Sequence, residues 1–318
     1  ENSWLLGDSG GFQIGKGVWE GDWKDINCPK AQKKREQVLA WMDAYMDYGM
    51  ILDIPAWVSR SPAGIKATGI SSYQEAVDAT RINNDYFMDN RNGNCKFLNV
   101  LQGENHTDAE DWYQQMKDYC DPKMYTDHFN GWSMGGQNMC DIHLVLKRIV
   151  ALRFDGLLEK GLHDYMHFLG TSKLEWATLL TDVQRAVRKY HNPNFTITFD
   201  CASPFLATAN GQIYIQTETE DRTKWVYRMV PSIDELKYAT DTRNFRDAVL
   251  QDGIFKNFTD SPLTKNIKVN DVCIYAPGDT NKVGGPKILA GEIDRDKHGN
   301  PILDEDGNEI IRKRDSTS

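Results

Sequence analysis

The chain lacks a long apolar run, and none of its hydrophobic segments approaches the roughly 18 residues that a membrane-spanning helix needs. Its first residues, Glu1 to Trp4, have neither the basic start nor the apolar core of a signal peptide, so we expect a cytoplasmic protein without membrane contact. The chain also starts without methionine, and we expect an N-terminal segment to precede Glu1.

Cysteine pairs are also missing. No C-x-x-C occurs, which disfavours a disulfide scaffold and a zinc site and indicates reduced thiols. No G-x-G-x-x-G follows an early apolar run, which disfavours a dinucleotide cofactor. We therefore expect no metal and no cofactor. The six cysteines are widely spaced, at Cys28, Cys95, Cys120, Cys140, Cys201 and Cys273.

The chain has a deficit of positive charge, with 37 Lys and Arg against 46 Asp and Glu and a net charge of −9. Bulk attraction to polyanions is disfavoured, although a local basic groove could still bind one. Two basic clusters could form such a groove or could simply be solvated helix faces. They are Lys30, Lys33, Lys34 and Arg35, and Arg185, Arg188 and Lys189.

What is present is an alternation of short apolar runs with amphipathic segments, the pattern of a parallel α/β protein. The spacing predicts strands at Trp4–Gly7, Met50–Ile54, Phe97–Leu101, Phe129–Met134, His167–Leu169 and Phe195–Phe199. It predicts helices at Ala31–Tyr48, Tyr73–Met88, Ala109–Tyr119, Ile142–Lys160 and Lys173–Tyr190.

Six strand–helix units favour a TIM (β/α)8 barrel whose two remaining strands lie in the missing N-terminal segment. A doubly wound open sheet is the alternative. We predict a barrel domain at residues 1–255, with strands at 213–216 and 225–229 and a helix at 233–251. Residues 256–318 would form a C-terminal extension without a zinc site, and turn residues at 297–301 and 306–308 indicate a surface hairpin there.

Polar or glycine-rich segments follow the predicted strands, at the ends that converge on one face of a βα barrel. Taken singly, each has a structural explanation as a helix N-cap or a tight turn. Their common register favours a shared pocket containing three carboxylates. The segments begin at Asp8, Asp53, Gln102, Gly131, Leu169 and Asp200.

These residues resemble the motifs of the tRNA-guanine transglycosylases, TIM barrels that exchange guanine for a 7-deazaguanine. The most specific match is Asp8-Ser9-Gly10-Gly11-Phe12-Gln13, which is similar to the family's D-S-G-G-F-Q. The others are Val100-Leu101-Gln102-Gly103, Gly131-Trp132-Ser133-Met134-Gly135, Phe168-Leu169-Gly170, and Thr198-Phe199-Asp200-Cys201 with Pro204 and Asn210-Gly211-Gln212. The resemblance covers residues 8 to about 214.

The resemblance implies a role for each matched residue. Asp200 would be the nucleophile that forms a covalent glycosyl-enzyme intermediate, and Asp8 would move protons on the two bases. Asp53 would bind the N1 and amino edge of guanine. The remaining substrate-binding residues would be Ser9, Phe12, Gln102, Gly131, Trp132 and Leu169, with Phe12 and Leu169 on the two faces of the ring.

Two departures from the family change the expected polymer. The C-x-C-x-x-C…H zinc site is missing, and the segment after Asp200 has no arginine between residues 205 and 211. This combination resembles the DpdA-like phage and bacterial enzymes that place 7-deazaguanines in DNA. We expect DNA as the partner and a base such as preQ0, with tRNA as the alternative polymer and a non-catalytic nucleic-acid-binding subunit as a third interpretation.

Other features remain open at this level. A phage-encoded enzyme would act in the host cytoplasm, and a homodimer or a partner that supplies specificity would be compatible with the sequence. Gly136 stands where family members that use an aminomethyl base place a glutamate, which favours a neutral substituent. The histidines have no ligand spacing, and we interpret His106, His143 and His167 as ordinary surface or core residues.

Overall fold

The computed structural model describes residues 4–171, 173–202, 212–218, 220, 226–231, 238, 240–252, 267–272, 292–293 and 311–312. The chain divides into two compact units, Glu1–Cys201 and Ala202–Ser318. The domain boundary predicted at residue 255 stays a prediction.

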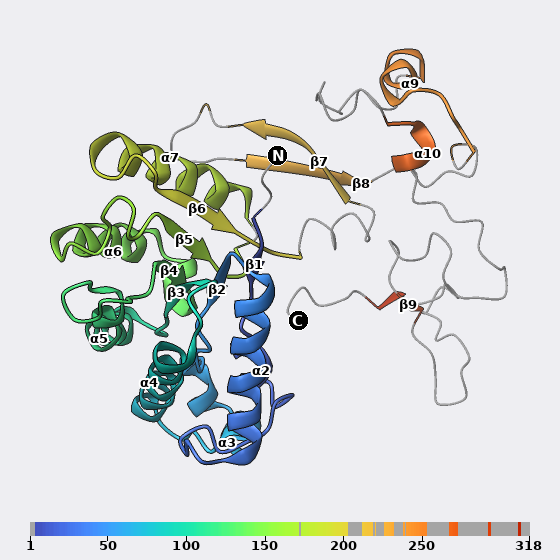
Figure 1. The fold of residues 1–318 in the computed structure, drawn as a ribbon. Helices are drawn as coiled ribbons and strands as arrows, with labels where there is room; N and C mark the ends of the chain where they lie inside the picture. Colours follow the sequence, from blue (N-terminus) through green and yellow to red (C-terminus); the bar gives the residue numbers. More distant parts are fainter. Residues whose placement is uncertain are drawn as a thin grey trace, which may run out of the picture. The chain divides into compact units, whose positions relative to one another are not determined.

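The first unit is an α/β fold with a six-stranded parallel sheet, as the sequence predicted (Figure 1). Neighbouring strands in the sheet are also consecutive in the chain, as expected for repeated strand–helix units. In the described residues, β1 and β6 are the two edges. The strands are β1 Leu6–Gly7, β2 Tyr48–Met50, β3 Lys96–Leu101, β4 Gly131–Met134, β5 Tyr165–Phe168 and β6 Thr196–Phe199.

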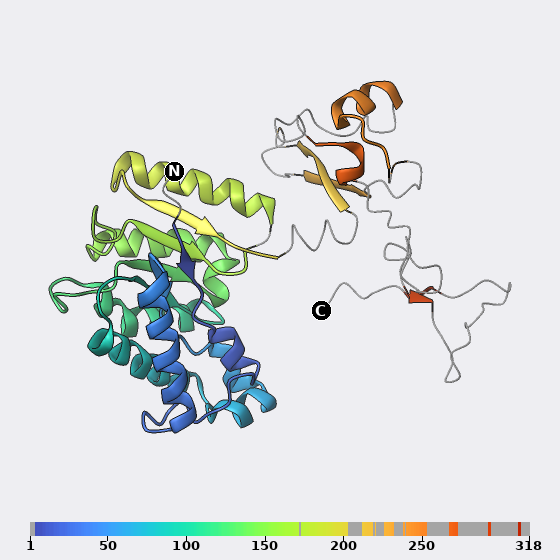
Figure 2. The same ribbon diagram turned by 45° about the vertical axis from the view of Figure 1, so that its right-hand side comes forward.

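The sheet is curled into a half-barrel with helices alternating along it (Figure 2). Tyr48 lies on β2 and Tyr165 on β5, yet their rings stack with centroids 4.5 Å apart. Two strands separate β2 from β5, so this contact requires the sheet to curve until its two halves face each other. Trp4 extends the stack at 5.5 Å from Tyr48, and its own side chain remains largely exposed.

The helices begin where polar side chains can bind free backbone N–H groups. Ser72 accepts from Glu75 N at 3.2 Å, and the Asn105 and Asp141 side chains cap α5 and α6 in the same way. The helices are α1 Gly11–Gly15, α2 Pro29–Tyr45, α3 Pro62–Thr68, α4 Tyr73–Asn90, α5 His106–Met116, α6 Ile142–Phe154 and α7 Leu174–Tyr190. The 3-10 turns are η1 Ala56–Arg60, η2 Lys117–Cys120 and η3 Gly136–Met139.

Several predicted boundaries in this unit are wrong. The helix predicted at Ala31–Tyr48 ends at Tyr45, and Tyr48 begins β2, because the chain turns extended at Met46. The second strand is β2, Tyr48–Met50, and not Met50–Ile54, because the chain leaves the ladder after Met50 while Ile51 and Leu52 stay buried. The helix predicted to reach Lys160 ends at Phe154, where Gly156 takes a left-handed conformation with φ 73°.

The described residues of the second unit form two antiparallel strand pairs and two helices. The strands predicted at 213–216 and 225–229 correspond to β7 Gln212–Glu218 and β8 Val226–Pro231, and β9 Glu292–Ile293 pairs with β10 Ile311–Arg312. The helices are α9 Phe245–Asp252 and α10 Val269–Val272. The predicted helix 233–251 is wrong at 241–244, which is not helical because the Asn244 side chain accepts from Arg246 N at the start of α9. The predicted turns at 297–301 and 306–308 lie outside the described residues.

None of the helices in the described residues is both long and apolar enough to cross a membrane.

Candidate functional site

The carboxyl ends of the six parallel strands meet at one edge of the half-barrel, where β/α proteins place their active sites. Five of the sequence-predicted segments are attached directly to this edge, and Asp53 lies three residues past the end of β2. The residues at the strand ends are Asp8, Asp53, Gln102, Gly135, Leu169 and Asp200.

Asp53 is a buried carboxyl, with 4 % of its surface exposed. Its Oδ2 accepts a hydrogen bond from Nε2 of Gln102 at 2.7 Å. Burial raises the pKa of Asp53 to about 7, with a smaller contribution in the same direction from the charge of Asp8, while the Gln102 bond opposes the shift. The group therefore titrates near neutral pH and is held in one position by its amide partner.

Two glycine segments enclose the Asp53–Gln102 pair. A Cβ at Gly11 would lie 2.6 Å from Oδ1 of Asp53, and one at Gly135 would lie 2.6 Å from Nε2 of Gln102. Gly136 has φ 54°, and its Cβ would lie 2.3 Å from the Gly103 carbonyl. Backbone can approach the pair this closely only where side chains are absent, which explains the glycines in both motifs.

Asp200 has the opposite environment. Its side chain is 69 % exposed, and Oδ1 accepts from His167 Nε2 at 3.1 Å and from the Gly170 backbone N–H at 3.3 Å. The His167 hydrogen bond, followed by that of Gly170, lowers the pKa of Asp200 against the effect of partial burial. Asp200 is thus an ionised, accessible carboxylate at neutral pH.

His167 is the residue that the sequence interpretation missed. It is buried inside the curled sheet, and its Nδ1 lies 2.8 Å from Thr198 Oγ1. Because a carboxylate only accepts, Nε2 is the donor in the bond to Asp200, while the Thr198 hydroxyl can donate to Nδ1 or accept from it. His167 is a core residue, as interpreted from the sequence, and its hydrogen bond to Asp200 was not foreseen. A signal existed, because Tyr165, His167 and Leu169 alternate along one face of β5.

The residues of the D-S-G-G-F-Q segment differ in how exposed their side chains are. Asp8 is exposed and accepts from Gly10 N at 3.3 Å, whereas Ser9 is buried. Phe12 is 58 % exposed, and its ring meets the edge of Trp57 at 6.1 Å. The Nζ of Lys16 lies 5.3 Å from the centre of the Phe12 ring, so this exposed ring has a cation as a neighbour. Leu169, at the end of β5, is half-buried.

Gly131 and Trp132 are not brought to this edge. They begin β4, which ends at Met134, and Gly135 and Gly136 directly after it take the place that we expected for Gly131. Trp132 is fully buried, with Nε1 donating to the Leu157 carbonyl at 2.9 Å. The resemblance pointed to Gly131, which begins the strand. The strand runs from Gly131 toward the site, so Gly135 and Gly136, which follow its carboxyl end, are the glycines at the site.

The two basic clusters contain arginines that are buried or bonded within the protein and lysines that are on the surface. Arg35 is fully buried, and its Nε donates to Asn83 Oδ1 at 2.6 Å, so it is a core residue. Arg185 pairs with Asp182 at 3.2 Å, and Arg188 donates to the Phe195 carbonyl at 2.5 Å. The lysines of the first cluster, Lys30, Lys33 and Lys34, remain as a surface group.

In the residues that the structure describes, no three His, Cys, Asp or Glu side chains are grouped as a metal site. The chain matches no model of a protein family and no curated protein.

Proposed function

We propose that the protein exchanges a guanine base in DNA for a 7-deazaguanine through a covalent glycosyl-aspartate intermediate. The observation that supports this most is the contrast between two carboxyls at one sheet edge: Asp200 is exposed with a lowered pKa, and Asp53 is buried with a pKa of about 7. An accessible carboxylate is suited to attack, and a buried one is suited to bind a polar ligand edge.

The proposed reaction has two displacements at C1′ of the deoxyribose. An Asp200 carboxylate oxygen forms a bond to C1′ as the bond from C1′ to guanine N9 breaks, and the leaving base takes a proton from Asp8. The incoming base then loses its N9 proton to Asp8, and N9 forms the new bond to C1′ as the Asp200 ester breaks. Two inversions give net retention, and both carboxyls return to their starting states.

The buried Asp53–Gln102 pair would recognise the base. As a carboxylate, Asp53 accepts from N1–H and the 2-amino group, and Gln102 has a second Nε2 hydrogen for the O6 carbonyl. The glycine backbone at Gly135 and Gly136 lies against Gln102 and leaves space for a flat ring. Phe12 and Leu169 supply the apolar faces, and the target base must leave its stack to reach them.

The 7-substituent of the incoming base should be neutral, as in preQ0. Gly136 offers no side chain, and the two nearby carboxylates have other partners. Glu104 pairs with Arg60 at 2.6 Å, and Asp141 pairs with His106 at 2.6 Å. An ammonium group would therefore lose its hydration without gaining a free anion.

We further propose that the half-barrel is part of a closed (β/α)8 barrel. In the described residues, β1 and β6 each have one neighbour, and the sheet is already curved enough for β2 and β5 to meet. Two more strand–helix units would pair with both free edges, which otherwise present unpaired backbone groups.

Transfer to tRNA is the alternative, and the sequence disfavours it because residues 205–211 have no arginine; that segment lies outside the described residues. A non-catalytic binding subunit is a third alternative, and the hydrogen-bonded placement of Asp200 disfavours it.

The test is label transfer. The protein is incubated with radiolabelled guanine or preQ0 and with either duplex DNA or bulk tRNA, and label should enter the DNA. Asp200→Asn should abolish transfer and the denaturation-resistant adduct, with little loss of stability because the side chain is exposed. Asp182→Asn, an equally exposed carboxylate on α7, is the matched control and should retain transfer. Full transfer by Asp200→Asn, or label in tRNA alone, would contradict the proposal.

A further inference from the structure

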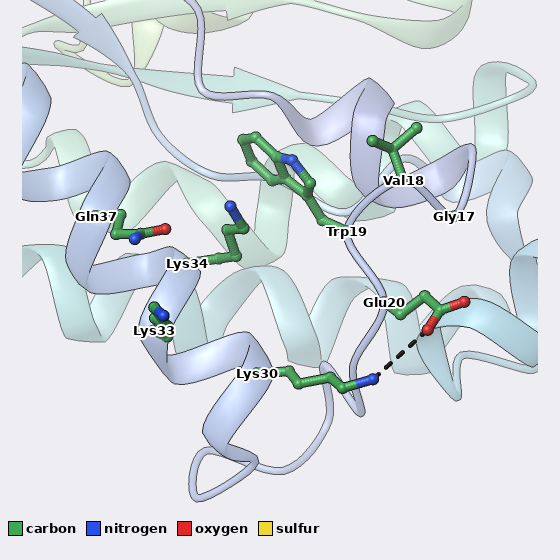
Figure 3. Close-up of a pocket in the computed structure, with 8 residues that line it drawn as sticks. All are labelled: Gly17, Val18, Trp19, Glu20, Lys30, Lys33, Lys34 and Gln37. Atoms are coloured by element: carbon green, nitrogen blue, oxygen red, sulfur yellow. Dashed lines mark ion pairs between the residues drawn. The ribbon is translucent and has the colours of Figure 1, made fainter.

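A groove with a volume of about 440 Å³ lies between α2 and the segment that follows α1 (Figure 3). Three lysines line it from α2, at positions 30, 33 and 34, together with Gln37. This spacing of three, four and seven residues places them on one face of the helix. The opposite face, with Ala31, Val38 and Met42, is buried in the core, so the lysine face is the surface of this helix.

Two of the three lysines have no acidic partner in the described part of the chain. Lys30 pairs with Glu20 at 3.5 Å across the groove, as Figure 3 shows. Lys33 is exposed, and Lys34 places its Nζ 4.9 Å from the centre of the Trp19 ring. In a protein with a net charge of −9, two neighbouring cations of this kind in a hollow are a local site for an anion.

The groove is also connected to the proposed active site. The Trp19 ring, which holds Lys34 on the groove side, packs against Gly10, where a Cβ would lie 2.4 Å from the ring. Gly10 N in turn donates to the Asp8 carboxylate at 3.3 Å. A chain of anionic groups bound along the lysines would therefore run directly beside the turn that carries Asp8.

We propose that this groove, called the α2 groove, binds the phosphate backbone of the polynucleotide, with Lys33 and Lys34 as the phosphate contacts and Trp19 as the support that orients Lys34. The proposal rests on the proposed function for the identity of the polymer. What it adds is the position on the protein where the phosphate backbone binds. Phosphate contacts position a nucleic acid without reading its sequence, which suits a site beside the base pocket.

The test compares two double variants with the same change of charge. Lys33→Gln/Lys34→Gln removes the proposed contacts, and Lys123→Gln/Lys160→Gln removes two exposed lysines that belong to neither basic cluster and precede β4 and β5. Glutamine has a helix propensity close to that of lysine, so folding should be preserved, which circular dichroism checks. Binding of a fluorescent 30-mer duplex DNA and of bulk tRNA is measured between 50 and 200 mM salt.

We expect the Lys33→Gln/Lys34→Gln variant to bind duplex DNA roughly tenfold more weakly at the lowest salt. The slope of log K against log salt should become shallower by about 1.8, or 0.9 for each lost phosphate contact. The control pair should change neither quantity. Equal weakening with tRNA would assign the groove to nucleic-acid backbones in general, and weakening with DNA alone would assign it to the duplex; both results support the proposal.

The proposal and the proposed function can fail separately. Unchanged affinity and slope in Lys33→Gln/Lys34→Gln would overturn the groove, whether or not label transfer occurs, and so would wild-type protein that binds neither polymer. Wild-type protein that binds through these lysines but transfers no base would leave the groove standing and reject base exchange. If the groove and base exchange are both correct, Lys33→Gln/Lys34→Gln should have a higher KM for DNA than the wild type and an unchanged kcat.

Discussion

Single residues at the sheet edge differ in ionisation because their surroundings differ, although Asp53 and Asp200 have the same side chain. Asp53 is buried and accepts one hydrogen bond from an amide, and the effect of burial on its pKa exceeds that of the hydrogen bond. Asp200 is exposed and accepts hydrogen bonds from two donors, and these bonds lower its pKa more than partial burial raises it. Burial and hydrogen-bond donors thus account for the different ionisation on which the proposed roles of the two residues depend.

Asp53→Asn should stabilise the protein at high pH and not at low pH. The folded pKa of about 7 lies above the unfolded value near 3.9, so between these values the folded state holds a proton that the unfolded state lacks. The free energy of unfolding therefore falls as pH rises through this window, by up to about 4 kcal/mol, and asparagine removes this loss. Urea denaturation at pH 4.5 and pH 8 measures the difference, and base exchange should be lost.

The control for this experiment is Asp182→Asn on the surface of α7, which should show no comparable change between the two pH values. An equal effect of Asp53→Asn at both pH values would show that Asp53 is not a buried titrating group.

His167 is a positioning residue for Asp200, and its replacement should alter the pH profile of exchange. His167→Leu removes the donor that lowers the pKa of Asp200, so the acid limb of kcat should move to higher pH. The loss of a hydrogen bond to a charged group should also reduce kcat roughly tenfold. His167→Gln, whose Nε2 can donate from a similar position, should restore most of both. A purely structural role would lower kcat without moving the acid limb.

Residues that act through contacts are the part of the site that sequence predicts least well. Asp8, Asp53, Gln102 and Asp200 could be proposed from the sequence because each follows a predicted or observed strand. His167 was not found, because its role depends on Asp200, which follows the next strand and is 33 residues further along the chain.

At the scale of elements, the sequence predicted which segments are helical or extended and was weaker on where they end. Apolar side chains continue through Ile51 and Leu52, which are buried without being in a strand, so hydrophobicity alone extends β2 too far. The start of α6 is readable because an Asp precedes it, and its end depends on the conformation of Gly156.

The cap of α6 gives a test at this scale. Asp141 Oδ1 accepts from His143 N at 2.9 Å and from Leu144 N at 3.2 Å, so Asp141→Ala should lower the free energy of unfolding by about 1 kcal/mol. Asp141→Asn keeps an acceptor and should stay within a few tenths of a kcal/mol. Chemical denaturation at pH 7 measures both.

The sign of the pH dependence at this cap is opposite to that of Asp53. The His106 hydrogen bond lowers the pKa of Asp141 to about 2, so its contribution is present above about pH 4 and is lost as the pH falls toward 2. If Asp141→Ala were as costly at pH 2 as at pH 7, the carboxylate would not be the source of the effect.

At the scale of the whole molecule, the hydrophobic core cluster formed by the described residues lies in the first unit. The members of this buried cluster all lie between Ile14 and Phe195, and the proposed catalytic and base-binding residues lie between Asp8 and Asp200. Alternating strands and helices made this predictable, because each strand–helix unit packs on the next one along the chain. The curvature that brings Tyr48 onto Tyr165 was predicted only through the choice of a barrel.

The position of the core leads to a prediction about a shortened chain. A fragment of residues 1–201 should fold and unfold cooperatively, because it keeps every member of this cluster and all six parallel strands. Trp225 is the single tryptophan after residue 201, while Trp23, Trp112 and Trp132 are fully buried in the first unit. Tryptophan fluorescence therefore reports almost entirely on this unit, and its melting curve should have nearly the same midpoint in the fragment and in the 318-residue chain carrying Trp225→Phe. A fragment that stays unfolded, or that melts many degrees lower, would mean that residues 202–318 supply part of the stability of the half-barrel.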